Sequence, residues 1–279
     1  MAFKLVIDSC CELPDALRSD PRIETIPFTM EVGDHQLVDD ETFDQQQFLR
    51  WIAESPTHPK SACPSPEQFM QAYHCDSDVD DVYVVTVSSK LSGSHNSAML
   101  GRRLFLEKEQ KNIHVCDSHS AVSGEGQIAM KLLDLVGLGL PFTEVVKRIT
   151  AYRDELRTYF VLDNLETLRK NGRLVGIKAI VAGALNIKPV MSAVKGSIVQ
   201  KSQAIGIKKA LTRMVETVIK ERPDTVASRL SIAHCNCLQR ALEVKGMFEN
   251  RANYKEIVVV GTKGVSSMYA NDGGVVIGV

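Results

Sequence analysis

Long apolar runs are absent from this sequence of 279 residues. None approaches the roughly 18 to 20 consecutive apolar residues that a membrane-spanning helix needs, so we expect no stable insertion into a membrane. The first residues, MAFKLVIDSCCELP, carry one lysine and a short apolar run before Asp8. This pattern is typical of a strand that opens a domain, and the lack of an export signal predicts a cytoplasmic location.

A large excess of charge of either sign is also lacking. The chain has 33 Lys and Arg against 34 Asp and Glu, which gives a formal net charge of −1. Surfaces that bind nucleic acid need a cationic excess, so we expect no nucleic-acid partner. A local basic cluster formed by Lys195, Lys201, Lys208 and Lys209 leaves open a role as an interaction module for an acidic partner. A solvated face is the simpler interpretation.

Paired cysteine spacings and cofactor motifs are missing as well. The seven cysteines are odd in number and scattered, which argues against a disulfide framework and for reduced thiols. The segment AHCNC (233–237) suggests a metal, but only one residue separates its two cysteines, whereas zinc sites usually use C-x(2–4)-C. Buried small side chains are the favoured interpretation. With no dinucleotide fingerprint and no P-loop, we expect neither a metal nor a cofactor.

Two periodicities alternate in the first half of the chain. The composition, 44% hydrophobic and 24% charged residues, is ordinary for a globular protein. Short apolar runs predict buried strands at 3–7, 82–87 and 113–117. Stretches of helical spacing predict helices at 43–54, 94–109 and 124–137. Strand–turn–helix repetition indicates βαβ units and a parallel sheet.

The second half mixes the two periodicities differently. Helices are predicted at 142–156, 163–170, 208–221 and 238–250, and strands at 158–162, 230–235 and 256–261. The segment 185–206 predicts antiparallel strands with a turn at Lys195-Gly196. We therefore predict an α/β protein of two domains, a parallel-sheet domain at 1–155 and a mixed α/β domain at 156–279. The apolar end, GGVVIGV, predicts a last strand, and this strand could lie on the N-terminal side.

Polar pairs follow three predicted strands of the first domain. They are Asp8-Ser9, Ser88-Ser89 and Asp117-Ser118. Ligands of open parallel sheets bind outside the carboxyl ends of the strands, where all three pairs should lie. Each pair could equally cap the following helix, and the two roles are compatible.

The segment LSGSHNSA places Ser92, Gly93 and Ser94 at the start of a predicted helix. Helix starts favour anions, glycine permits close approach, and hydroxyls add donors, so a carboxylate or phosphate is the natural ligand. A catalytic serine would need a base and an orienting group. No G-x-S-x-G pattern is present, and His95 is adjacent only in sequence. A serine hydrolase is therefore disfavoured.

Six segments then combine into a larger pattern. In chain order they are VIDSCCELP (6–14), SACPSPEQF (61–69), VSSKLSGSHNSA (87–98), CDSHSAVSGEGQ (116–127), FVLDNLETLRKNGRL (160–174) and LNIKPV (185–190). Each is similar to a motif of the DegV family, and all six occur in the family's order. The chain resembles that family across nearly its whole length.

The resemblance implies a two-domain carrier of a long-chain fatty acid, and with it we expect no catalytic residue and no enzyme activity. The carboxylate would lie near the domain interface, and the acyl chain in an apolar tunnel mostly within the second domain. A separate fatty acid kinase would be the partner, phosphorylating the carboxyl group that this protein presents. A long acyl chain is consistent with the many aliphatic residues of the second half, although these would fill any domain core: Leu162, Leu165, Leu168, Leu174, Ile177, Ile180, Val181, Leu185 and Ile187.

The resemblance also assigns site residues by position. The ligand-binding residues would be Ser61, Ser92, Gly93, Ser94, Arg173 and Tyr269. Many members end in a His-Thr-Gly-Pro-Gly segment, where this chain reads YANDGG and places Tyr269 at the histidine position. A phenol can donate a hydrogen bond but cannot carry a positive charge. An alternative remains: an enzyme acting on a small anionic or acyl substrate, with Asp8 and Asp117 beside the serine loops.

Overall fold

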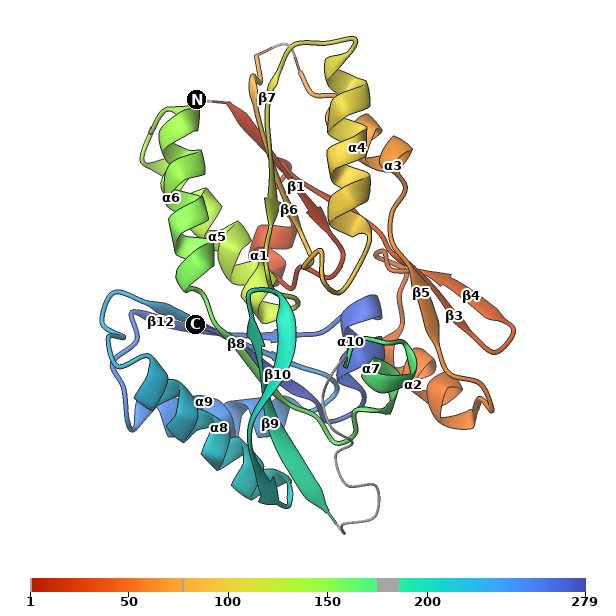
Figure 1. The fold of residues 1–279 in the computed structure, drawn as a ribbon, viewed down its shortest axis with the longest axis vertical. Helices are drawn as coiled ribbons and strands as arrows, with labels where there is room; N and C mark the ends of the chain where they lie inside the picture. The colour runs from red at the N-terminus through yellow and green to blue at the C-terminus, as the bar shows by residue number, and fades with distance from the viewer. Residues whose placement is uncertain (1, 77, 175–185) are drawn as a thin grey trace.

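The computed structural model describes residues 2–76, 78–174 and 186–279 and has two α/β lobes stacked along its longest axis (Figure 1). The N-terminal lobe is built on a four-stranded sheet of order β2-β1-β6-β7 in which all pairings are parallel. Its strands are β1 (Phe3–Asp8), β2 (Ile23–Ile26), β6 (Asp81–Thr86) and β7 (Asn112–Asp117). The predicted parallel sheet is confirmed.

Helices cover both faces of this sheet because its strands are apolar on both sides. They are α1 (Asp15–Arg18), α3 (Pro66–Ala72), α4 (Ser94–Leu106), α5 (Ser123–Gly137) and α6 (Phe142–Glu155). Successive strand residues point to opposite faces. Leu5 and Ile7 of β1 pack with α5 and α6, whereas Val6 packs with α3 and α4. The alternation places two separate cores on one sheet.

The C-terminal lobe has a six-stranded mixed sheet of order β10-β9-β8-β13-β11-β12. Its strands are β8 (Thr158–Val161), β9 (Ile187–Val194), β10 (Ser197–Ile205), β11 (Arg229–His234), β12 (Glu256–Gly261) and β13 (Val275–Gly278). Helices α8 (Ile207–Glu221) and α9 (Leu238–Glu249) cover one face. The last strand, β13, lies inside this sheet between β8 and β11 and not beside the N-terminal sheet. The domain boundary at residue 155 stays a prediction.

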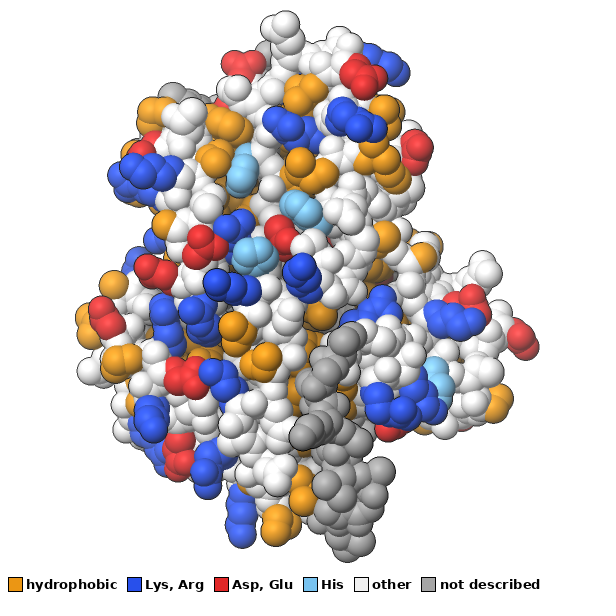
Figure 2. Space-filling model, viewed as in Figure 1, with side chains coloured by type: hydrophobic (Ala, Val, Ile, Leu, Met, Phe, Trp, Pro, Cys, Tyr) orange, Lys and Arg blue, Asp and Glu red, His pale blue; other side chains and the backbone are white. Residues whose placement is uncertain are grey.

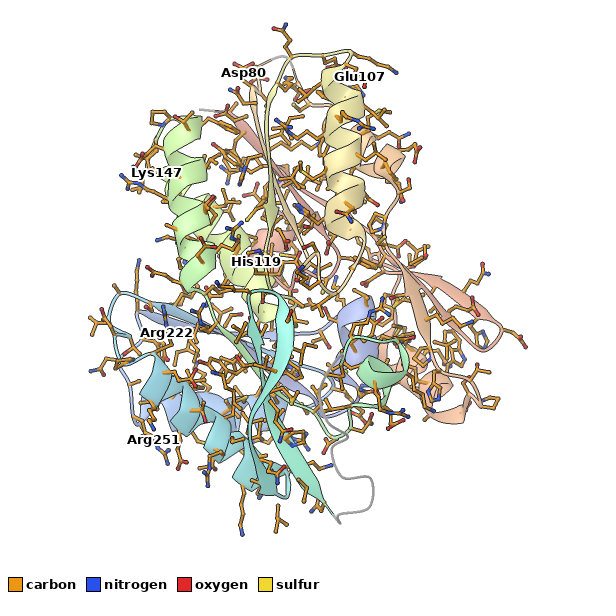
Figure 3. The ribbon with its side chains drawn as sticks, viewed as in Figure 1. Asp80, Glu107, His119, Lys147, Arg222 and Arg251 are labelled. Carbon is orange, nitrogen blue, oxygen red and sulfur yellow. The ribbon has the colours of Figure 1, made fainter. Side chains whose placement is uncertain are left out.

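The predicted turn at Lys195-Gly196 is confirmed, and it joins the two lobes. Both residues have positive φ, 48° and 83°, as tight hairpin turns require. The hairpin tip contacts the N-terminal lobe, where Ser88 Oγ donates to the Gly196 carbonyl at 3.2 Å. A Cβ on Gly196 would lie 2.4 Å from Ser88 Oγ and 3.6 Å from the Cα of His119, which Figure 3 shows at the junction of the lobes. Only glycine fits this contact.

A third, small sheet was not predicted from the sequence. It has the order β4-β3-β5, with β3 (Thr29–Val32), β4 (His35–Val38) and β5 (Lys60–Ala62). Next to it lie α2 (Gln45–Glu54), α7 (Glu166–Lys170) and α10 (Gly264–Ala270). Their apolar residues meet the second face of the six-stranded sheet in one cluster. This cluster surrounds the main cavity.

The basic residues of the C-terminal lobe are interspersed with acids. On the face that Figure 2 shows, blue and red side chains alternate over this lobe. Lys201 lies 3.0 Å from both carboxylate oxygens of Glu221. Lys195 lies at the hairpin tip, and Lys208 lies at the start of α8, beyond the far end of β10. The arrangement supports a solvated face over a single basic docking patch. No helix among the described residues is long and apolar enough to span a bilayer.

Candidate functional site

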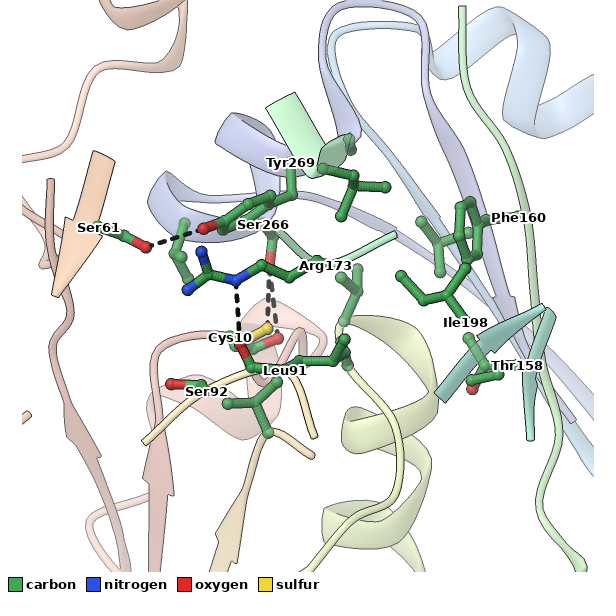
Figure 4. Close-up of a pocket in the computed structure, with 18 of the residues that line it drawn as sticks. Cys10, Ser61, Leu91, Ser92, Thr158, Phe160, Arg173, Ile198, Ser266 and Tyr269 are labelled. Carbon is green, nitrogen blue, oxygen red and sulfur yellow. Dashed lines mark hydrogen bonds between the residues drawn. The ribbon is translucent and has the colours of Figure 1, made fainter. Parts of the chain in front are cut away.

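A largely apolar cavity lies between the carboxyl ends of the parallel strands and the six-stranded sheet (Figure 4). The space between its lining atoms, the mouth open to solvent included, is about 810 Å³. Its lining comes from both lobes, and most of the lining side chains are apolar.

The floor of the cavity is one face of the six-stranded sheet. Alternate residues of one segment, Thr158, Phe160 and Leu162, line it. Ala193 lies opposite Thr158 in the β8–β9 ladder, and Ile198 lies opposite Ala193 in the β9–β10 ladder. Because cross-strand partners share a face, a row across three strands forms one end of the floor.

The opposite wall comes from the loops that follow the parallel strands. Cys10 follows β1, Leu91 and Ser92 follow β6, and Ala121 and Val122 follow β7. In the strand order β2-β1-β6-β7, β2 lies on one side of β1 and β6 lies on the other. The connections that follow β1 and β6 therefore run in opposite directions along the sheet. Such a switch point is where open α/β sheets bind ligands. The expected edge of the sheet therefore does line the cavity.

Four of the six predicted site residues meet at one end of this cavity. They are Ser61 on β5, Ser92 after β6, Arg173 after α7, and Tyr269 on α10. Ser61 Oγ and Tyr269 Oη lie 3.2 Å apart. Figure 4 shows this polar group at the opposite end of the cavity from Phe160, Thr158 and Ile198. The cavity thus has a hydroxyl-rich cationic end and an apolar remainder.

Arg173 is the cation of the polar end, and its guanidinium is held on several sides. Its Nε donates to the Leu91 carbonyl at 3.1 Å, and one terminal nitrogen donates to the Asn171 carbonyl. The guanidinium carbon lies 5.6 Å from the centre of the Tyr269 ring. Gly172, with φ 75°, makes the sharp reversal that brings Arg173 back toward the cavity. A fixed guanidinium fork suits an anionic oxygen pair.

The other two predicted residues, Gly93 and Ser94, do not line the cavity. Ser94 is fully buried, and its hydroxyl donates to Asp8 Oδ2 at 2.6 Å. A Cβ on Gly93 would lie 3.1 Å from Cys63 Sγ. Both residues therefore shape the loop that carries Ser92 and do not face the ligand space themselves.

Asp8 and Asp117 both hold loops in place. Asp8 accepts hydrogen bonds from the amides of Cys10 (3.1 Å) and Val87 (2.9 Å) in addition to Ser94. Asp117 accepts from the Ser89 amide at 3.0 Å, from the Ser89 hydroxyl and from the His119 amide at 3.2 Å. Burial opposes ionisation of Asp117, but these hydrogen bonds keep its pKa below the ordinary value. Neither carboxylate lines the cavity.

Helix α10 is anchored by two buried carboxylates from distant parts of the chain. Glu12 accepts from the Lys263 amide at 2.6 Å, and Asp39 accepts from the Val265 amide at 2.8 Å. Burial raises the pKa of Glu12 to about 7 and raises the pKa of Asp39. Because α10 carries Val265, Ser266, Tyr269 and Ala270 of the cavity wall, these carboxylates fix part of the site.

Several lining residues were missed by the sequence reasoning. Cys10, Phe28 and Ser266 line the cavity beside the expected residues, and Ser266 Oγ donates to the Cys10 carbonyl at 3.4 Å. The segment GVSSMYA had no apolar periodicity that would have marked it as a wall helix. Of the aliphatic candidates, Leu162 and Leu168 line the cavity, whereas Ile177, Ile180, Val181 and Leu185 lie outside the described residues.

The segment AHCNC, which suggested a metal, has ordinary structural surroundings. Cys235 is fully buried, and the Cys237 amide donates to His234 Nδ1 at 3.3 Å. Within residues 2–76, 78–174 and 186–279, no group of three or more His, Cys, Asp or Glu side chains could hold a metal ion.

Glu125 on α5 should make the free energy of unfolding fall as pH rises. Its carboxyl is fully buried, and neither oxygen has a hydrogen-bond partner among the described residues. Burial raises the pKa of Glu125 well above its ordinary value of 4.5, and the charge of Asp8 raises it further. The folded protein keeps a proton that the unfolded chain releases above that value. Stability therefore falls by up to about 1.4 kcal/mol per pH unit from this group.

Replacing this carboxyl by an amide, Glu125→Gln, is expected to reduce that loss of stability. Urea unfolding at pH 5 and pH 8 should show a smaller decrease for the variant, with the variant the more stable protein at pH 8. Part of the pH dependence should remain in the variant, because burial also raises the pKa of Asp8 to about 6 and of Glu12 to about 7. Burial lowers the pKa of His114 to about 4, and that histidine acts in the opposite direction in both proteins. The exposed Glu243→Gln serves as the control. Equal slopes for Glu125→Gln and the wild type would contradict this assignment.

Comparison with known proteins identifies the family. Residues 2–279 match the model described as "Uncharacterised protein, DegV family". A DegV domain-containing protein of Streptococcus pyogenes serotype M3 is 37% identical over 287 residues, which cover 100% of this chain and 99% of the relative.

Two solved structures agree with this match. A DegV family protein from Ruminococcus gnavus, refined with vaccenic acid, is 45% identical, with a TM-score of 0.96 and coverage of 100% and 99% of the two chains. The Streptococcus pneumoniae Fatty Acid Kinase (Fak) B3 protein, loaded with linoleic acid, is 33% identical, with a TM-score of 0.87 and the same coverage. The mixed α/β fold, with its parallel N-terminal sheet, is that of these proteins. The chain belongs to the DegV family.

Proposed function

We propose that this protein binds a long-chain fatty acid in the cavity and presents its carboxyl group to a partner kinase. The observation that carries the proposal is the division of one cavity into two parts. A polar end is formed by Ser61, Ser92, Arg173 and Tyr269. The floor, whose lining residues include Leu162 and Ile198, is almost entirely apolar. A molecule with one anionic group and a long hydrocarbon chain matches this division.

The contributions to the free energy of binding favour the same ligand. Each buried methylene contributes about 0.8 kcal/mol, so a long chain supplies most of the binding free energy. A carboxylate that leaves water needs hydrogen bonds or a cation in return. Arg173 offers the cation, and the hydroxyls of Ser61 and Ser92 offer donors. The bound acids of the Ruminococcus and pneumococcal relatives belong to the same ligand class.

We infer a carrier and not an enzyme. His95 Nδ1 is hydrogen-bonded to the Thr86 hydroxyl at 3.3 Å, and His95 does not line the cavity. Burial lowers the pKa of His95. The alternative, an enzyme that uses Asp8 and Asp117, is disfavoured because both carboxylates hold backbone amides and lie outside the cavity lining. The kinase partner follows from the resemblance to the pneumococcal kinase subunit.

Ser92→Ala is the variant that tests the carboxylate end. Removing the hydroxyl should weaken binding of vaccenic acid by about 1 to 3 kcal/mol if it pairs with the buried carboxylate. Titration of lipid-free protein measures this change. Ser97→Ala, on the first turns of α4 and outside the cavity lining, is the matched control and should bind like the wild type. An unchanged affinity for Ser92→Ala would remove this serine from the site.

A further inference from the structure

Tyr269 makes two contacts at the polar end of the cavity. Its hydroxyl lies 3.2 Å from Ser61 Oγ on the small sheet. The face of its ring lies 5.6 Å from the guanidinium carbon of Arg173, which belongs to the segment after α7. One side chain therefore connects two groups that come from different parts of the fold and that both line the cavity.

The Arg173 side chain needs such support because its other contacts lie along its edges. Nε and one terminal nitrogen bond to the backbone carbonyls of Leu91 and Asn171. These bonds lie in the plane of the guanidinium and leave its faces uncovered. Figure 4 shows the side chain lying between Tyr269 and the loop of Leu91 and Ser92. A guanidinium that lies over the face of an aromatic ring is attracted to it, and this attraction helps to hold the cation in place.

We propose that Tyr269 is a positioning residue of the head-group site: its ring holds the Arg173 guanidinium and its hydroxyl holds Ser61, so that a carboxylate meets a preset arrangement of one cation and two hydroxyls. The inference rests on the proposed function and deepens it. Preorganised donors bind more tightly because less side-chain freedom is lost on binding. Tyr269 acts through its neighbours, and its two contacts act separately.

The anchoring of α10 supports this role. Tyr269 lies at the end of a helix whose first amides are held by Glu12 and Asp39, and its carbonyl accepts from Asn271 Nδ2 at 3.2 Å. The backbone at Tyr269 is therefore fixed independently of Ser61 and Arg173. A ring on a fixed backbone can set the position of the arginine, whereas a ring on a free loop would follow it.

Two double-mutant cycles, read as affinity for vaccenic acid, test the proposal. In the first, Tyr269→Phe and Ser61→Ala each weaken binding by roughly two- to tenfold. The double variant should bind little worse than either single variant, because both remove the same hydrogen bond. In the Arg173→Gln background, by contrast, Tyr269→Phe should weaken binding by the same factor as it does in the wild type.

The second cycle isolates the ring. Going from Tyr269→Phe to Tyr269→Leu should cost a further three- to thirtyfold, roughly, with Arg173 present. The same step should cost almost nothing in the Arg173→Gln background. A residue that only filled space would lose the same factor in both backgrounds. Thermal unfolding of every variant checks folding, and should Tyr269→Leu fail to fold, the Tyr269→Phe cycle still decides the hydroxyl contact.

Tyr152 provides the matched control because Lys131 Nζ lies 5.5 Å from the centre of its ring, outside the cavity lining. Tyr152→Phe should leave the affinity unchanged. Additive effects in both cycles, with normal binding by the wild type, would overturn the positioning role and leave the proposed function intact. No binding of the acid by the wild type would overturn the proposed function and this inference together.

Discussion

Replacing Ala193 by phenylalanine should reduce the affinity for vaccenic acid by at least about 100-fold. Ala193 lies between Thr158 and Ile198 in the row across β8, β9 and β10, at the apolar end of the cavity floor. A phenylalanine there would occupy the space of the acyl chain. Excluding about four methylenes at about 0.8 kcal/mol each corresponds to this loss.

Chain length and a neighbouring residue distinguish a blocked cavity from a damaged fold. Acids short enough to stop before Ala193 should bind Ala193→Phe nearly as well as they bind the wild type. Val194 is the next residue, is 36% exposed and points to the other face of the strand, so Val194→Phe should leave the affinity unchanged. If Ala193→Phe retained wild-type affinity for both long and short acids, the acyl chain would not lie on this floor.

Replacing Gly126 by alanine should lower the free energy of unfolding by about 3 kcal/mol. Gly126 lies in the first turns of α5, where a Cβ would lie 2.1 Å from the backbone carbonyl oxygen of Glu12. A backbone atom cannot rotate away as a side chain can, so α5 would have to move from the β1 loop. Forcing extra atoms into a packed site costs about this much.

The same helix supplies the control for this prediction. Gly137 lies at the exposed end of α5. Apart from the neighbouring backbone of the helix itself, no described atom lies within 4 Å of the position that a Cβ on Gly137 would take. Gly137→Ala should stabilise the protein by roughly 0.5–1 kcal/mol, because alanine is the better helix former. Urea unfolding at one pH measures both variants. Equal effects of the two substitutions would show that the contact with Glu12 is not what requires a glycine.

The features that could be predicted from the sequence are those set by local periodicity. Apolar runs marked three of the four strands of the parallel sheet but not β2, a short edge strand that is only partly buried. The positive φ of Lys195 and Gly196 matches the turn that their residue types predicted. The small sheet escaped prediction because its strands are only three or four residues long and β4 is almost wholly exposed. A short strand with little burial leaves no alternating pattern to detect.

The site required contacts that no local pattern contains. Ser61 and Tyr269 are 208 positions apart in the chain, and Glu12 anchors Lys263 across 251 positions. The site residues came from the resemblance of short motifs to the family, not from periodicity. Of those six, Gly93 and Ser94 support the loop while the other four face the cavity. The family motif marks the loop as a whole and does not separate these roles.

Native mass spectrometry of the purified protein tests the central claim most directly. We predict a 1:1 complex with a long-chain fatty acid, either carried through purification or formed when vaccenic acid is added to lipid-free protein. The Ala193→Phe variant, measured in parallel, should show little of this complex. A wild-type protein that carries no acyl chain and forms no complex with the added acid would contradict the proposed function.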